Sequence, residues 1–200
     1  NENFMISPLS AGFLLSALNN GAQGQTSKQI LAALGYEDYT LAQVNEYCRL
    51  LLEGSGAVDR KVNVGIHNAL IINDDYSLKP AFAESLTSYY DAYVQSADFS
   101  KKTTLDMIND WCNKKSNGLI PSVVEELNLN AVIYALNCIY FKAGWSNKFL
   151  PENTEKENFT DIEAKTQQVM MMNAEDRYLL SENGTWKTLA LPFSNGQYKM

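Results

Sequence analysis

The feature that most constrains the fold is the long apolar run from Ala131 to Trp145, AVIYALNCIYFKAGW. A strand with one exposed face alternates apolar and polar residues. An unbroken run of branched, aromatic and aliphatic side chains is typical of a strand covered on both faces. Asn137 is the polar residue in the middle of this run. The run therefore predicts a buried strand that carries one amide.

The two faces of this strand follow from the alternation of side chains along the backbone. One face carries Val132, Tyr134, Leu136, Cys138 and Tyr140, and the other carries Ala131, Ile133, Ala135, Asn137, Ile139 and Phe141. Asn137 is thus expected in the core. A buried amide without a partner costs about 1 to 3 kcal/mol, so we expect another part of the fold to form a hydrogen bond with Asn137.

Length and charge narrow the class of protein. The 200 residues are 46% hydrophobic and 20% charged, which predicts one large domain or most of one. The net charge is -7 and the pI is about 4.8, which argues against nucleic acid or an anionic membrane as a partner. The sequence contains no run of eighteen apolar residues, so it predicts no membrane-spanning helix. The chain opens at Asn1 without a hydrophobic signal segment, so we expect a processed or truncated start.

Three cysteines, Cys48, Cys112 and Cys138, stand far apart in the sequence. Their number and spacing fit neither a disulfide framework nor a zinc site, so we interpret them as buried apolar thiols. No cofactor and no metal is predicted. Two glycosylation-type triplets begin at Asn158 and Asn183, but such triplets arise often by chance.

The order of helices and strands can be predicted along the chain. Ser7 and Pro8 suit the start of a helix that Gly21 closes, and Thr26 with Gln29 forms a capping-box pattern before a helix that ends at Gly35. Further on we expect helices over 41–53, from Pro80 and from Thr104, strands over 62–72, 92–99 and 131–145, and strands with turns after Trp145.

Several segments, in this order, resemble one family. They are Phe4–Ser10, Gly21–Thr26, Ile108–Trp111, Ser116–Ile120 and Leu136–Trp145, followed by Phe149, Thr154, Phe159, Val169–Met172 and Leu189–Phe193. The family is the serpins, whose best-studied members inhibit serine and cysteine proteases. The resemblance implies an α+β fold, with helices packed around a large central β-sheet A and with parts of sheets B and C.

The resemblance also implies roles for single residues. Residues similar to Ser7, Ser10 and Asn137 form the shutter, a region beneath the point where the central sheet of a serpin opens. A hydrogen-bond network there can have two defined arrangements, whereas apolar contact has no direction. By the same resemblance Trp145 belongs to the breach at the top of the sheet.

The mechanism implied by the family is inhibition rather than turnover. A protease cleaves an exposed reactive loop and forms an acyl-enzyme, and the loop then inserts as a new strand into the sheet of a metastable protein. Distortion of the attached protease halts deacylation. The implied partner is a serine or cysteine protease. The helix over 41–53 has only Arg49 as a basic residue, which argues against heparin-type activation. We expect an extracellular or cell-envelope location, with an intracellular one as the alternative.

The chain has roughly half the length of a full serpin domain, so we interpret residues 1–200 as one partial domain truncated at both ends. The reactive centre is not in this chain. Residues 1–200 alone would expose apolar strand edges, so we expect a missing C-terminal portion or a complementary chain to cover them.

The residues also have simpler interpretations. Ser7 suits an ordinary helix cap, Ser10 a first-turn surface hydroxyl, Asn137 a satisfied core amide and Trp145 a core aromatic. Three functions stay open: an inhibitory serpin, a non-inhibitory serpin-fold carrier, chaperone or storage protein, and a hydrolase with a cysteine nucleophile and His67 as base. We favour the inhibitor. His67 is the only histidine, and nothing in the sequence joins it to a cysteine.

Overall fold

The computed structural model describes residues 6–200. Phe4 and Met5, which belong to the first segment of the resemblance, lie outside the described residues. The chain forms two compact units, one of residues up to Ala57 with Val64–Phe141, the other of Val58–Asn63 with Lys142–Met200. We describe each unit by itself. No helix within residues 6–200 is long and apolar enough to cross a membrane.

The first unit contains the long helices, and proline sets the start of two of them. The helices are α1 (Pro8–Asn19), α2 (Gly24–Ala33), α3 (Leu41–Ser55), α4 (Pro80–Tyr90) and α5 (Lys102–Lys115). The fixed φ of proline and its missing N–H suit the first helical position, which Pro8 and Pro80 occupy. The Ser7 side chain accepts a hydrogen bond from the Ser10 N–H at 3.2 Å and so caps α1. The predicted helix starts at Ser7–Pro8 and at Pro80 are confirmed.

The predicted capping box at Thr26 and Gln29 is wrong. Helix α2 begins two residues before Thr26, after an N-cap at Gln23 that forms no side-chain hydrogen bond. Thr26 therefore lies inside the first turn, where it cannot cap the helix. The capping box is found instead at α3, where the Thr40 side chain accepts from the Gln43 N–H and the Gln43 side chain accepts from the Thr40 N–H.

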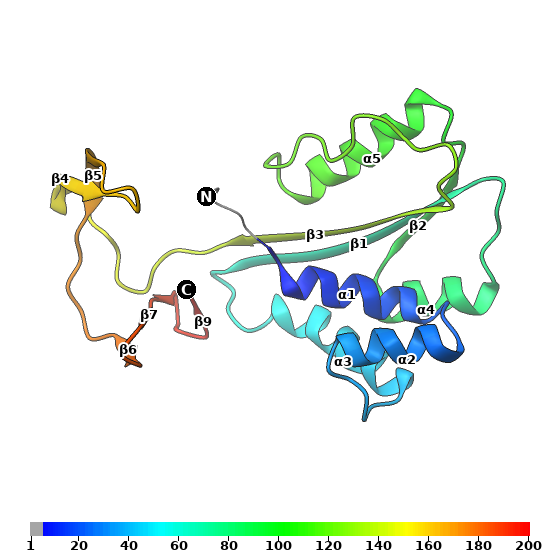
Figure 1. Cartoon of the computed structure of the whole chain (residues 1–200), viewed down its shortest axis with the longest axis horizontal. Coiled ribbons are helices and arrows are strands. Elements are labelled where there is room, and N and C mark those ends of the chain that lie inside the picture. Colours follow the sequence, from blue (N-terminus) through cyan, green and yellow to red (C-terminus); the bar gives the residue numbers. More distant parts are fainter. Residues whose placement is uncertain (1–5) are drawn as a thin grey trace. The chain divides into compact units, whose positions relative to one another are not determined.

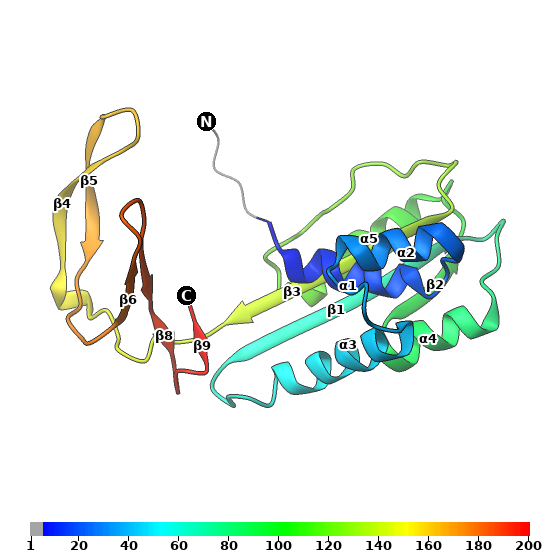
Figure 2. The same ribbon diagram turned by 60° about the horizontal axis from the view of Figure 1, so that its bottom comes forward.

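Three strands form the sheet of this unit: β1 (Asn63–Asn73), β2 (Tyr93–Ala97) and β3 (Ile133–Lys142), in the order β2-β1-β3. β1 and β2 are parallel, with Ala69 opposite Tyr93. β1 and β3 run in opposite directions (Figure 2), because Asn73 bonds to Val132 while Asn68 bonds to Asn137. β3 is thus an edge strand of this sheet.

Helices cover both faces of the sheet, with α1–α4 on one side and α5 on the other (Figure 1). Leu70 and Ile72 of β1 pack with Ile133 and Ala135 of β3 in the core beneath α1, α3 and α4. On the opposite face the smaller core under α5 contains Ile71, Ile108, Phe99, Tyr134 and Leu136. The predicted alternation is confirmed for Ile133 and Ala135 on one face and for Tyr134 and Leu136 on the other. It is wrong for Ala131, which lies before β3 and packs with Tyr134 and Leu136, and the predicted burial is wrong for Val132 and Phe141, which are exposed. β3 ends at Lys142 rather than at Trp145.

The second unit consists of short strands and turns, as predicted for the chain after Trp145. A one-turn helix, η1 (Pro151–Asn153), precedes six strands that pair as three antiparallel hairpins. The strands are β4 (Thr154–Thr160), β5 (Thr166–Met172), β6 (Leu179–Glu182), β7 (Lys187–Ala190), β8 (Pro192–Phe193) and β9 (Tyr198–Lys199). The hairpins expose apolar side chains, among them Leu179 and Met170, in the described part of the chain.

The three cysteines yield a prediction about thiol reactivity. Cys48, Cys112 and Cys138 are all buried and free, and burial raises the pKa of each thiol. A raised pKa lowers the fraction of reactive thiolate at neutral pH. We expect the folded intact protein to react slowly with Ellman's reagent at these three positions. Full reaction should follow in denaturant, and rapid labelling of the native protein at these cysteines would contradict the burial.

Candidate functional site at the β1–β3 strand pair

The amide of Asn137 has its main partner on the neighbouring strand. Asn137 Nδ2 donates to Asn68 Oδ1 at 2.8 Å, and Asn68 Nδ2 donates to the Tyr90 carbonyl oxygen at 2.8 Å. Asn68 is only 2% exposed. The expectation that another part of the fold forms a hydrogen bond with Asn137 is confirmed, and the Asn137 side chain is half-buried.

The end of helix α4 explains why Asn68 finds an acceptor there. The last carbonyl groups of a helix lack partners within the helix. Tyr90 is the last residue of α4, and Asp91 follows in the left-handed conformation with φ 45°, so the chain turns away toward β2. Asn68 uses the carbonyl that this turn leaves free. It therefore joins the helix end to both strands.

One atom of Asn137 is left without a partner. Asn137 Oδ1 is buried, and no residue between 6 and 200 donates a hydrogen bond to it. A buried acceptor without a donor costs about 1 to 3 kcal/mol. A donor from outside these residues would remove this cost.

The two serines of the expected shutter do not bond to Asn137. Ser7 is exposed and caps α1, and Ser10 is half-buried with its N–H on the Ser7 side chain. Within the described chain no hydrogen bond joins either serine to Asn137, and the shutter role of the three residues stays a prediction. The partner found in its place is Asn68, which sequence reasoning missed. Its signal was a polar residue just before the apolar segment Ala69–Ile72.

Trp145 lies in the second unit, in an aromatic cluster. Its ring stacks on Phe193 with centroids 4.4 Å apart at 14°, and it meets Phe149 edge-on at 5.8 Å. Backbone contacts hold this stack, because Trp145 forms an isolated bridge with Phe193 and the Ser146 N–H donates to the Pro192 carbonyl. Trp145 thus anchors a turn of chain, and its breach role stays a prediction.

His67 does not form a catalytic pair with a cysteine. The antiparallel offset that joins Asn68 to Asn137 also places His67 opposite Cys138. Burial, together with the charge of Lys115, lowers the pKa of His67, while burial raises the pKa of Cys138. Among residues 6–200 no hydrogen bond joins His67 to a thiol. Both groups are therefore favoured in their neutral forms, which does not support the hydrolase.

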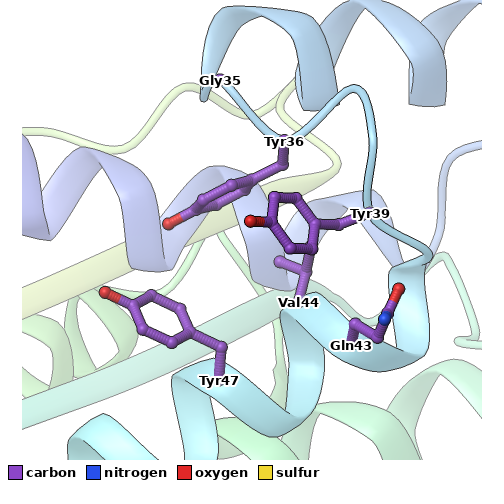
Figure 3. A pocket seen from close by; sticks show the side chains of 6 residues that line it. All are labelled: Gly35, Tyr36, Tyr39, Gln43, Val44 and Tyr47. Atoms are coloured by element: carbon purple, nitrogen blue, oxygen red, sulfur yellow. The ribbon is translucent and has the colours of Figure 1, made fainter.

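A separate pocket of about 430 Å³ lies where the chain passes from α2 to α3. Figure 3 shows the rings of Tyr36, Tyr39 and Tyr47 around it. Tyr36 meets each of the other two nearly edge-on at 6.2 Å. Residues 6–200 contain no group of three or more His, Cys, Asp or Glu side chains that could hold a metal ion. The pocket can accept an apolar or aromatic group.

Comparisons with known proteins agree with this architecture. The family model described as "Serpin (serine protease inhibitor)" matches residues 1–200. Human neuroserpin is 26% identical over 210 residues, which cover 100% of this chain and 51% of neuroserpin. The native structure of the thermophilic serpin tengpin has a TM-score of 0.89 at 28% identity and covers 100% of this chain and 51% of tengpin. Human thyroxine-binding globulin has a TM-score of 0.86 at 26% identity, over 96% of this chain and 54% of the globulin.

The chain belongs to the serpin family. It spans about half the length of the curated relatives that it matches. The predicted fold, with helices around the central sheet, is confirmed by the match to solved serpins.

The Asn137–Asn68 hydrogen bond predicts the effect of a substitution. Asn68→Ala leaves the Asn137 Nδ2 group without an acceptor and the Tyr90 carbonyl without this donor, so we expect the free energy of unfolding to fall by about 1 to 3 kcal/mol. Chemical denaturation of the intact protein measures this change. Asn130→Ala is the control, because Asn130 is exposed and its side-chain amide has no hydrogen bond within the described chain. Equal stability of the two variants would contradict the assignment.

The aromatic cluster predicts a second effect. Trp145→Ala removes two aromatic pairs worth about 0.5 to 1.5 kcal/mol each, so we expect a loss of about 1 to 3 kcal/mol. Thermal unfolding of the intact protein measures it. Trp186→Ala is the matched control, because Trp186 is 70% exposed. A Trp186→Ala variant that loses as much stability as Trp145→Ala would show that the cluster contributes nothing specific.

Proposed function

We propose that the protein containing this chain inhibits a serine or cysteine protease by the suicide-substrate mechanism of serpins. A reactive loop beyond residue 200 is cleaved, and the loop then inserts into the central β-sheet. The membership of the chain in the serpin family supports this proposal.

The observation that carries the proposal is the position of β3. This ten-residue strand pairs with β1 on one side and has no strand on its other side within the described sheet. Helix layers already cover both of its faces. An incoming strand can therefore add only along the free edge, where it would satisfy a row of backbone N–H and C=O groups.

The chemistry then follows from the movement of the loop. The protease serine or cysteine attacks the loop carbonyl and forms an acyl-enzyme, and the cleaved loop carries the attached protease with it as it inserts. A displacement of about 1 Å in catalytic geometry can lower a rate about a hundredfold, which halts deacylation. The serpin itself needs no catalytic group for this step.

The partners form part of the same proposal. They are the target protease and the remaining portion of the domain, or a complementary chain, which would complete the sheet beside β3. Activation by a polysulfated chain is not expected. Arg49 of α3 already donates to Glu46 at 2.6 Å and also to Glu53, so its charge is offset by two carboxylates. We propose action outside the cell or in the cell envelope, where such proteases act.

A second candidate is a serpin-fold carrier that does not inhibit. The tyrosine-lined pocket between α2 and α3 favours it, since pockets with aromatic walls suit small apolar ligands. The similarity to thyroxine-binding globulin, named for its ligand, points the same way. The free edge of β3 leads us to favour the inhibitor.

The test of inhibition uses the intact protein and a panel of serine and cysteine proteases. We expect at least one protease to form a covalent complex that survives denaturing electrophoresis, because the acyl-enzyme is trapped. Protease inactivated at its nucleophile is the control and should form none. Cleavage of the loop without complex formation, and without a rise in the unfolding temperature, would favour the carrier.

A further inference from the structure

A path of buried and partly buried hydrogen bonds runs from the helices to strand β3 and ends at the Asn137–Asn68 pair. Asn20, just after α1, and Asn45 of α3 form a reciprocal amide pair, in which each Nδ2 donates to the other Oδ1 at 3.0 and 2.8 Å. The Tyr90 hydroxyl donates to Asn45 Oδ1 at 2.6 Å. Through its carbonyl, Tyr90 accepts from Asn68, which in turn accepts from Asn137.

Tyr90 is the residue through which this path passes from the helices to the sheet. Its side chain is completely buried, and its hydroxyl and carbonyl bond to different elements. Burial raises the pKa of the phenol well above its ordinary value, so the hydroxyl stays protonated and donates. Asn45 is 5% exposed and Asn68 is 2% exposed. Water therefore has little access to the two bonds of Tyr90, to Asn45 and from Asn68.

We propose that Asn45, Tyr90 and Asn68 are positioning residues that couple helix α3 to the edge strand β3 by fixing the Asn137 amide. The inference rests on the proposed function, because it assigns these residues to the strand beside which the sheet opens. The reason is geometric. The terminal carboxamide of Asn137 can turn to present either its NH2 group or its oxygen. The fixed Asn68 oxygen selects the orientation in which the NH2 group faces it. The orientation directs Asn137 Oδ1, the acceptor without a partner, away from Asn68.

The coupling is carried by an alternation of covalent and hydrogen-bonded links. A shift of α3 moves Asn45, which changes the hydrogen bond of the Tyr90 hydroxyl and with it the end of α4. The Tyr90 carbonyl at that end fixes Asn68. Removing any of these bonds weakens the attachment of β3 to β1. A hydrogen bond of ordinary strength corresponds to about a threefold to tenfold change in an opening equilibrium.

The experiment measures hydrogen exchange of the β3 backbone amides in the intact protein, by mass spectrometry of peptides that cover Asn137. Tyr90→Phe removes only the hydroxyl, and Asn68→Ala removes the link to the strand. We expect each variant to speed exchange in β3 by about threefold to tenfold. Both substitutions act on one path. We therefore expect the double variant to speed β3 exchange by less than the product of the two single-variant factors.

Two matched controls separate coupling from general loss of stability. Tyr89→Phe makes the same chemical change one position earlier, at a hydroxyl with no hydrogen bond in the described chain. Asn109→Ala removes another side-chain amide that bonds to backbone groups, since it donates to the Val124 carbonyl and accepts from the Val123 and Val124 N–H groups, and within the described chain it has no hydrogen bond to β1 or β3. We expect both controls to leave exchange around Asn137 within twofold of the parent protein.

Unchanged β3 exchange in Tyr90→Phe would overturn the proposal, even if Asn68→Ala speeds exchange. Equal effects of the variants and their controls would overturn it too. The proposed inhibition is judged separately by covalent complex formation. A protein that traps no protease but shows the expected exchange pattern would retain the coupling and lose the inhibitor assignment.

Discussion

The structure of the first unit depends on the need of the sheet that contains β1 and β3 to be covered on both of its faces. A single layer cannot satisfy this need, so α1, α3 and α4 cover one face and α5 covers the other. The pairing with β1 satisfies the backbone of β3 on one side only. The same burial makes the amide of Asn137 costly unless it is paired, and so it imposes a second polar residue, Asn68, on the neighbouring strand.

Local sequence signals predicted the elements better than their connections. Ser7 with Pro8 and Pro80 gave correct helix starts, because capping and the fixed φ of proline act within a few residues. The capping pattern at Thr26 failed, because the same pattern of residue types occurs at Thr40, and only the surrounding fold decides where a helix begins. The alternation of side chains along β3 was predicted because it depends only on the strand geometry.

The candidate site could be predicted only in part. The need of Asn137 for a hydrogen bond followed from its apolar surroundings, but the identity of the partner depends on a pairing between residues 68 and 137, which local patterns do not contain. Family resemblance directed attention to Ser7 and Ser10, whose hydrogen bond lies within the first turn of α1. Tyr90 was missed because its carbonyl, rather than its side chain, faces Asn68. The role of Trp145 could not follow from β3, since its ring packs with Phe149 and Phe193 of the second unit.

The chemical composition of the path from Asn20 to Asn137 has a consequence for the conditions under which it works. Its members are carboxamides, a peptide carbonyl and a buried phenol that burial keeps protonated. None of these groups gains or loses a proton between mild acid and mild alkali, and none carries a net charge for dissolved ions to screen. The link between helix and strand therefore keeps the same hydrogen bonds over this range of acidity and ionic strength.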